Sequence, residues 1–275
     1  MVYNTVVMDM DGTLLDDKKH ITANTLEVLN RLQKKGVNIV IATGRLWESP
    51  NQYAKYYNLF SHTIAANGTI ITDNKGNLVD EGSLSSKSLL SLLKIVREYG
   101  AGYYFVGDKI IYTSNLKADV GAFYQPIGLE HCFPRIAEAE ANSIGVDSAE
   151  PMGIRKFLLY HRDDTVLEKI KNEINTLEDV EISSSFRQNV EITPKGFHKG
   201  WALKRLMDHI NVNIRETVAF GDYLNDKTLL ETAGMAVVME NGHPKLKEIA
   251  TRIAPANNED GVAVVLNQME AEGLL

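Results

Sequence analysis

The sequence lacks the features of secreted, membrane and nucleic-acid-binding proteins. Its one cysteine, Cys132, cannot form an internal disulfide and has no cysteine or histidine neighbours at metal-binding spacing, so we expect a reducing, cytoplasmic location. No run approaches the ~18 apolar residues of a membrane span, and no basic segment leads into a long apolar stretch near Met1, so neither membrane insertion nor export is expected. The net charge of −7 gives no broad attraction for nucleic acid. Any anion site must therefore be built locally.

The first part of the chain predicts alternating strands and helices. A strand is expected over 5–8, a helix from the capping residue Thr22 to the stop at Gly36, and a second strand over 37–42. Such an order implies a right-handed parallel crossover, and the ligands of open α/β sheets bind beyond the carboxyl ends of the strands. The loops that follow these two strands are therefore predicted to lie at the same edge of one sheet.

Two carboxylates follow the first strand. Asp9 and Asp11 are two residues apart, and carboxylates this close repel each other unless a cation lies between them. Mg²⁺ suits such a pair because it prefers hard oxygen ligands and takes one or two protein carboxylates beside water and phosphate. An Asx-rich turn after a core strand is the alternative interpretation of these residues.

Further polar groups follow other predicted strands. Thr43 and Gly44 follow the second strand and could cradle a phosphate, although a plain turn has the same composition. Asn67 is expected in a hairpin turn that could face the site. Lys199 begins a predicted helix, where a bound phosphate would offset its charge, and a solvated surface lysine is the alternative. Asp222 ends a strand predicted over 217–220 and could supply a second metal ligand.

The pattern of elements changes between Gly82 and Asn189. Helices are predicted over 85–99, 115–126 and 165–177, an antiparallel hairpin over 103–112, and strands over 156–160, 180–183 and 190–192. We interpret residues 83–188 as an inserted α+β domain with its own sheet. Residues 1–82 and 189–275 are then the two parts of the core domain, which resumes with predicted helices over 199–210, 244–250 and 262–269 and a strand over 236–239.

These motifs resemble those of a known family. In chain order, the residues that match are Asp9-Met10-Asp11-Gly12-Thr13-Leu14, Thr43-Gly44-Arg45, Lys199-Gly200 and Gly221-Asp222-Tyr223-Leu224-Asn225-Asp226. They are similar to the four motifs of the haloacid dehalogenase superfamily of aspartyl phosphatases. Ala66-Asn67-Gly68 and Val190-Glu191-Ile192 resemble its Cof-type branch, whose cap domain is inserted between the second and third motifs. The resemblance implies an α/β fold, with a Rossmann-like parallel-sheet core, helices on both faces and an inserted α+β cap domain.

The resemblance also implies a role for each motif residue. Asp9 would be the nucleophile that forms an aspartyl-phosphate, and Asp11 the general acid and then the general base. Mg²⁺ would be held by the side chains of Asp9 and Asp222 and the backbone carbonyl of Asp11, while Asp226 would orient Lys199 or metal-bound water. Phosphate and substrate contacts are expected from the Met10 backbone N–H, Thr43, Gly44, Arg45, Lys199 and Asn225.

The sequence therefore predicts a Mg²⁺-dependent phosphatase that hydrolyses a small phosphomonoester, such as a sugar phosphate, without nucleic-acid or membrane partners. The inserted domain would act as a lid that excludes water. Leaving-group contacts could come from Tyr103, Tyr104, Arg155 and Arg187, each of which could equally have a core or surface role. Two alternatives remain, a phosphomutase that uses the same aspartyl-phosphate and a non-catalytic regulator that binds a phosphorylated ligand.

Overall fold

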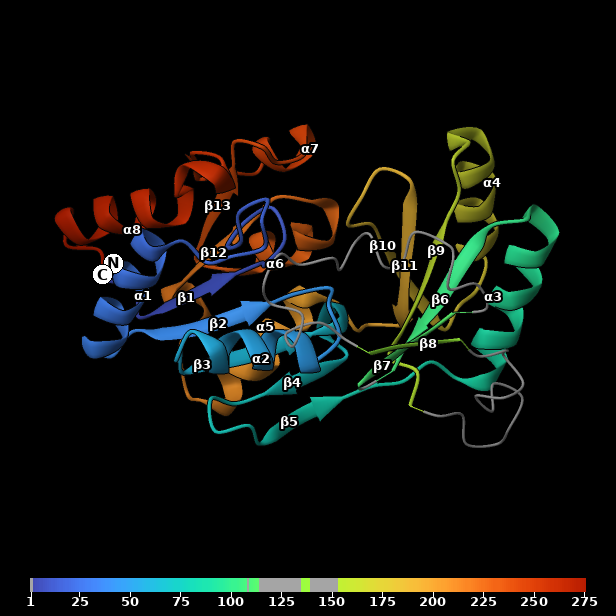
Figure 1. Ribbon diagram of the computed structural model, residues 1–275, viewed down its shortest axis with the longest axis horizontal. Helices are drawn as coiled ribbons and strands as arrows, with labels where there is room; N and C mark the ends of the chain where they lie inside the picture. Colours follow the sequence, from blue (N-terminus) through green and yellow to red (C-terminus); the bar gives the residue numbers. More distant parts are fainter. Residues whose placement is uncertain (1, 108, 114–134, 139–152) are drawn as a thin grey trace.

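The protein is described here by a computed structural model that covers residues 2–107, 109–113, 135–138 and 153–275 (Figure 1). The expected helix over 115–126 and the single cysteine, Cys132, lie outside the described residues. Among the helices of the described part, none is both long and apolar enough to cross a membrane. The two ends of the chain lie together, and the Tyr3 N–H donates to the Leu274 carbonyl over 2.7 Å.

An eight-stranded sheet forms the core, with the order β14-β13-β12-β1-β2-β3-β4-β5. Its strands are β1 (Thr5–Met8), β2 (Asn38–Ala42), β3 (Ser61–Ala65), β4 (Ile70–Thr72), β5 (Leu78–Glu81), β12 (Thr217–Gly221), β13 (Met235–Met239) and β14 (Arg252–Ala254). The strands from β14 to β3 pair in parallel, whereas β3, β4 and β5 pair antiparallel. The predicted hairpin after residue 65 is confirmed, because the short helix η1 (Ala66–Gly68) connects β3 to β4.

Helices cover both faces of this sheet, as predicted. Val6 and Met8 of β1 pack with α1 (Ala23–Lys34), α2 (Glu48–Tyr56) and α8 (Gly261–Ala271). Val7 points to the opposite face, which packs with α5 (Lys199–His209), α6 (Lys227–Thr232) and α7 (Pro244–Lys247). Three further short helices are η5 (Ile214–Glu216), η6 (Leu224–Asp226) and η7 (Asn257–Glu259). Burial on both faces explains why the central strands are continuous apolar runs.

The ends of α1 follow the predicted signals. The Thr22 side chain accepts a hydrogen bond from the Thr25 N–H, and Gly36 follows the last turn with a φ of 89°. The sequence analysis did not predict α2, whose first turn follows Trp47 without a side-chain cap. Capped helices were therefore easier to find than this one.

A second sheet belongs to the inserted segment, with the order β10-β11-β9-β6-β7-β8. Its strands are β6 (Gly102–Val106), β7 (Ile110–Thr113), β8 (Arg135–Glu138), β9 (Lys156–Tyr160), β10 (Val180–Ser183) and β11 (Asn189–Pro194). The helices α3 (Ser86–Tyr99) and α4 (Asp164–Ile174) cover the face of this sheet that points away from the core (Figure 1). The other face is turned toward the core domain, where Tyr104, Val106 and Leu158 pack against Leu46 and Ala66.

The predicted return to the core at residue 189 needs a correction. Residues of β11 pair antiparallel with β9 on one side and β10 on the other, so this strand lies inside the second sheet. The alternation of Val190, Glu191 and Ile192 predicts a strand but does not say which sheet the strand joins. We therefore propose that the cap domain extends to Pro194, and that the chain re-enters the core just before α5.

We predict that Gly68→Ala destabilises the protein more than Gly76→Ala. Both glycines have left-handed backbones, with φ of 103° and 82°, which costs an L-residue ~1–2 kcal/mol. A Cβ at Gly68 would also lie 2.7 Å from the His198 carbonyl oxygen at the start of α5, whereas a Cβ at Gly76 would meet nothing within 4 Å. Urea denaturation should show a loss of about 1 kcal/mol for Gly76→Ala and at least about twice that for Gly68→Ala. Equal losses would contradict the close approach of η1 to α5.

Candidate active site

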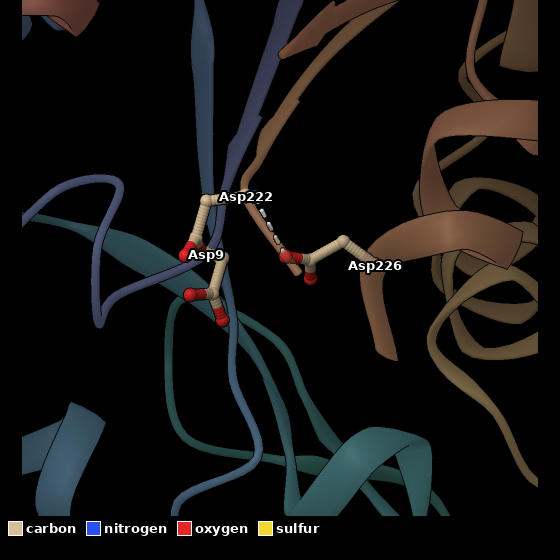
Figure 2. Close-up of side chains that lie close together, drawn as sticks. All are labelled: Asp9, Asp222 and Asp226. Carbon is tan, nitrogen blue, oxygen red and sulfur yellow. Dashed lines mark hydrogen bonds between the residues drawn. The ribbon is translucent and has the colours of Figure 1, made fainter. Parts of the chain in front are cut away.

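Three loops meet where neighbouring parallel strands end. Asp9 follows β1, Thr43 follows β2 and Asp222 follows β12, and β1 pairs with both of the other strands. Lys199 enters from the first turn of α5. The strand-helix-strand order predicted that the loops after β1 and β2 lie at one edge of the sheet, and the family resemblance added Lys199 and Asp222. Asp9 and Asp222 do come together (Figure 2), and Lys199 contacts Asp9.

Asp9, Asp222 and Asp226 form a compact acidic cluster. One carboxylate oxygen of each lies within 4.8 Å of the others (Figure 2). Burial raises the pKa of Asp9 to about 7, and the neighbouring Asp226 charge adds to this, while the Lys199 ammonium lowers it. Burial and the Asp9 charge also raise the pKa of Asp222 well above its usual value. This set of hard oxygen donors fits a divalent cation such as Mg²⁺, whose charge would offset the repulsion.

Lys199 contacts the acidic cluster and is fully buried. Its ammonium donates to Asp9 Oδ1 over 2.6 Å and to Asp226 Oδ1 over 2.6 Å. Although burial disfavours the charged form, the two carboxylates raise the pKa of Lys199 above its usual value, so the ammonium stays protonated. Asp226 Oδ2 accepts the N–H groups of Asp222 and Tyr223. Asp226 therefore orients both Lys199 and the loop that carries Asp222.

Several hydrogen-bond donors near Asp9 remain available for an oxyanion. Within the described residues, the backbone N–H groups of Met10 and Gly44 have no hydrogen-bond partner. The Thr43 hydroxyl oxygen accepts the Arg45 N–H over 3.1 Å, so its hydrogen is left to donate. Thr43 and Gly44 line the same cavity as Asp9. This is the donor arrangement that the sequence predicted for a phosphate site.

Asp11 is held by two cations. Its carboxylate accepts Arg45 Nε over 2.6 Å, Arg45 Nη2 over 2.7 Å and Lys19 Nζ over 2.7 Å. Burial alone would raise the pKa of Asp11, but the Arg45 guanidinium and the Lys19 ammonium hold it well below its usual range. Arg45 also donates to Ser49 and lies over the Tyr53 ring. Arg45, which we predicted to contact the substrate, therefore binds Asp11 here, and the sequence analysis missed Lys19.

The cap contributes a buried ion pair that the sequence analysis also missed. Lys156 of β9 and Glu191 of β11 are both about 2% exposed, and their charged atoms are 2.6 Å apart. Lys156 also donates to the Gly44 carbonyl over 2.6 Å, and Glu191 accepts from the Asn67 side chain over 2.8 Å. The pair thus joins the cap sheet to both core loops next to Thr43. A charged residue inside each of two apolar strands was the signal that could have revealed it.

Asn225 connects the same network to the fourth motif. Its side-chain amide donates to the Asn67 side-chain oxygen over 3.3 Å, and its backbone N–H donates to the Ser184 carbonyl of the cap over 2.9 Å. Asn225 also lines the cavity beside Asp9. The predicted phosphate-binding residue is therefore also a contact between the two domains.

A cavity of about 610 Å³ lies between the core and the cap. Of the four cap residues predicted to contact a leaving group, Tyr104 lines this cavity. Tyr103 points to the opposite face of β6, where it stacks on Phe157. Arg155 pairs with Glu81 and donates to the Gly82 carbonyl where the cap begins, and Arg187 pairs with Asp164. Alternation along β6 explains why Tyr104 and Tyr103 point to opposite faces.

Comparisons with known proteins agree with this geometry. The sequence pattern of the haloacid dehalogenase-like hydrolases matches residues 6–266. The chain is 27% identical to phosphatase YwpJ of Bacillus subtilis (strain 168), over 96% of this chain and 99% of that protein. It is also 27% identical to 5-amino-6-(5-phospho-D-ribitylamino)uracil phosphatase YcsE of the same organism, over 94% and 92%. The solved structure of a haloacid dehalogenase-like hydrolase from B. subtilis superposes with a TM-score of 0.86 at 27% identity, over 97% of this chain and 99% of that one.

We predict that Lys156 and Glu191 depend on each other for stability. Lys156→Met or Glu191→Leu alone leaves a buried charge without its partner and should lower the free energy of unfolding by about 3–5 kcal/mol. The double variant removes both charges and should recover most of that loss in urea denaturation. A double variant as unstable as the sum of the two single variants would contradict this.

The double variant should nevertheless bind inorganic phosphate more weakly than the wild type. In it the Gly44 carbonyl loses the Lys156 ammonium and Asn67 keeps only its 3.3 Å contact with Ser183 of the cap, so the loop next to Thr43 is held less firmly. Isothermal titration calorimetry at a temperature where both proteins are fully folded separates weaker phosphate binding from unfolding. Wild-type phosphate affinity in the double variant would show that the ion pair has no effect on the loop.

We predict that Mg²⁺ binds more tightly as the pH rises. Cation binding requires the Asp9 carboxylate, so affinity should rise by up to about tenfold per pH unit below the Asp9 pKa of about 7 and level off above it. The stability of the metal-free protein should depend on pH in the opposite direction. The raised pKa of Asp9 in the folded state stabilises the fold at low pH, and this stabilisation is lost as the pH rises through about 7. Calorimetric titrations at several pH values test this, with Asp222→Asn as a variant that lacks one ligand. A pH-independent affinity would exclude Asp9 as a ligand.

Proposed function

The chain belongs to the haloacid dehalogenase-like hydrolases, and from this premise we propose that it is a Mg²⁺-dependent phosphatase acting on small phosphomonoesters. The observation that carries the proposal is the convergence of Asp9, Asp222 and Lys199 beside unpartnered backbone N–H groups. The relatives YwpJ and YcsE are both named as phosphatases, which supports this class of reaction. We expect a small soluble metabolite as substrate and a cytoplasmic site of action, as the sequence predicted.

Asp9 is proposed as the nucleophile. Its carboxylate oxygen attacks phosphorus, the bond from phosphorus to the leaving oxygen breaks, and an aspartyl-phosphate forms on Asp9. The Lys199 ammonium, 2.6 Å from Asp9 Oδ1, orients the attacking carboxylate and offsets the negative charge that gathers around phosphorus. Asp226 keeps this ammonium in place from the other side.

Asp11 is proposed as the proton carrier. In the first half of the reaction a protonated Asp11 gives its proton to the leaving alkoxide, and in the second half the Asp11 carboxylate takes a proton from the attacking water. The contacts with Arg45 and Lys19 hold Asp11 as a carboxylate, which is the form that the second half needs. The first half therefore requires this pair of contacts to loosen when substrate binds. We assign Arg45 and Lys19 the task of positioning Asp11.

The oxygens of the phosphoryl group that is transferred would be bound by residues of the motifs. Backbone N–H groups of Met10 and Gly44 and the Thr43 hydroxyl donate from one side. Asp9, Asp222 and the Asp11 carbonyl would hold Mg²⁺, which supplies positive charge that neutralises the phosphate oxygens. The cap would act as a lid that closes over this cavity and keeps bulk water from the reacting atoms.

We predict that Asp9→Asn abolishes phosphate release from an aryl phosphate, by roughly a thousandfold or more, because an amide cannot act as the nucleophile. EDTA should suppress the wild-type reaction, and added Mg²⁺ should restore it. With a sugar phosphate as substrate, free inorganic phosphate is the product of a phosphatase, whereas a phosphomutase would return an isomerised sugar phosphate. Metal-independent release, or full activity of Asp9→Asn, would reject the mechanism.

We predict a different defect for Asp11→Asn. An aryl leaving group needs little protonation, so Asp9 should still be phosphorylated, but water is not activated and the second step stalls. A rapid burst of one equivalent of phenolate followed by slow turnover is expected, with one phosphoryl group retained on the protein by mass spectrometry. The same measurement on Asp9→Asn is the control and should show neither burst nor phosphoprotein.

A further inference from the structure

The face of the cap sheet that is turned to the core carries apolar side chains beside the Lys156–Glu191 pair where it lines the cavity. Tyr104 of β6 is paired with Leu158 of β9, and both side chains point to this face. Gly102 and Tyr160 form the next pair along the same two strands, and Tyr160 lines the cavity as well. These two strands therefore contribute two aromatic rings and a leucine to the wall of the cavity.

The orientation of the Tyr160 ring is fixed by the absence of a side chain at Gly102. A Cβ built at Gly102 would lie 2.2 Å from Tyr160 Cζ and 2.5 Å from Cε2, so the ring covers the glycine backbone. No other residue leaves room for the ring to lie this way. The aromatic wall is thus held in one position.

Phe186 adds a third aromatic ring at the rim of the cavity. It is 47% exposed, which is unusual for a phenylalanine, and it lies in the loop between β10 and β11. The Asn189 side-chain oxygen accepts the N–H groups of Ser185 and Phe186, and the Ser184 hydroxyl donates to the Phe186 carbonyl. The loop is therefore ordered by its own hydrogen bonds and presents an apolar ring next to the site.

Several polar side chains of the same cavity are already used by the protein. Lys156 and Glu191 bind each other, Asn225 binds Asn67, and Gln188 donates to the Arg162 carbonyl over 3.0 Å. A bound sugar would bury several hydroxyl groups beside these four side chains, which already bind other groups of the protein. Unpaired buried hydroxyls weaken binding strongly, whereas an apolar ring needs no such partners.

We propose that the cap half of this cavity receives a planar, mostly apolar ring, so that the preferred substrates are phosphomonoesters of ring-bearing primary alcohols and not of polyhydroxylated sugars. The inference rests on the proposed phosphatase activity. It narrows the leaving group to aryl-methyl or heteroaryl-methyl alcohols, whose ring lies against Tyr104, Tyr160 and Phe186. Aromatic contacts of this kind stabilise a bound ring beyond the burial of its area.

The substrate test compares kcat/KM for benzyl phosphate, cyclohexylmethyl phosphate, glucose 6-phosphate and methyl phosphate at saturating Mg²⁺. The first three are esters of primary alcohols of comparable size, so they differ mainly in planarity and hydroxyl content. Benzyl phosphate should exceed glucose 6-phosphate by at least about tenfold and cyclohexylmethyl phosphate by about threefold. Methyl phosphate serves as the reference without a ring.

The variant test uses Phe186→Ser, with Phe60→Ser as its matched control. Both residues are exposed phenylalanines, at 47% and 68%, but Phe60 lies outside this cavity. Phe186→Ser should lower the ratio of kcat/KM for benzyl phosphate to that for methyl phosphate by about three- to tenfold, and Phe60→Ser should leave the ratio unchanged. Gly102→Ala displaces the Tyr160 ring without removing it and should lower the same ratio.

The outcomes separate this inference from the proposed function. Equal or greater kcat/KM for glucose 6-phosphate, or an unchanged ratio in Phe186→Ser, overturns the ring preference while Mg²⁺-dependent hydrolysis of acetyl phosphate stands. Absence of turnover of every ester, acetyl phosphate included, overturns both proposals. A ring preference that is lost in Phe186→Ser and kept in Phe60→Ser supports the inference.

Discussion

The arrangement of the site depends on one buried ammonium group between two carboxylates. Lys199 lies 2.6 Å from both Asp9 and Asp226, and its side chain is fully buried. One positive charge faces three carboxylates there, because Asp222 belongs to the same cluster. Burial and this excess of negative charge together raise the pKa of Asp9 and of Asp222. The excess negative charge therefore favours the binding of a further cation, and the proposed Mg²⁺-dependent reaction requires one.

The cap contacts the loops of the proposed phosphate site and also covers them. Lys156 and Glu191 extend from the cap sheet to Gly44 and Asn67 of the core, and Asn225 of the core binds the Ser184 carbonyl of the cap. Any movement of the cap away from the core must break these buried polar contacts together, which is costly unless water or ligand replaces them. The position of the cap and the shape of the loop next to Thr43 are therefore energetically coupled.

The two faces of the cap sheet contact different parts of the protein. Phe105, Phe157 and Leu159 form a core with α3 and α4, while Tyr104 and Leu158 on the opposite face point to the core domain. Because successive residues of a strand alternate between faces, a shift of one residue would exchange the structural and the cavity-lining side chains. The packing of the cap and the contacts proposed for the leaving group thus depend on alternate positions of the same strands.

The sequence by itself determined the alternating strands and helices, the edge of the sheet at which the motifs meet, and the residues Asp9, Thr43, Lys199 and Asp222 that converge there. The elements and the shared edge follow from local patterns and from the rule that parallel strands end at one edge, whereas the place of Lys199 followed from the resemblance of the motifs to a known family. Only the tertiary structure decided which sheet β11 joins, that Arg45 and Lys19 hold Asp11, and that Lys156 reaches Gly44. These outcomes depend on contacts between residues far apart in the chain, since pairing and side-chain partners are set by packing and not by local spacing.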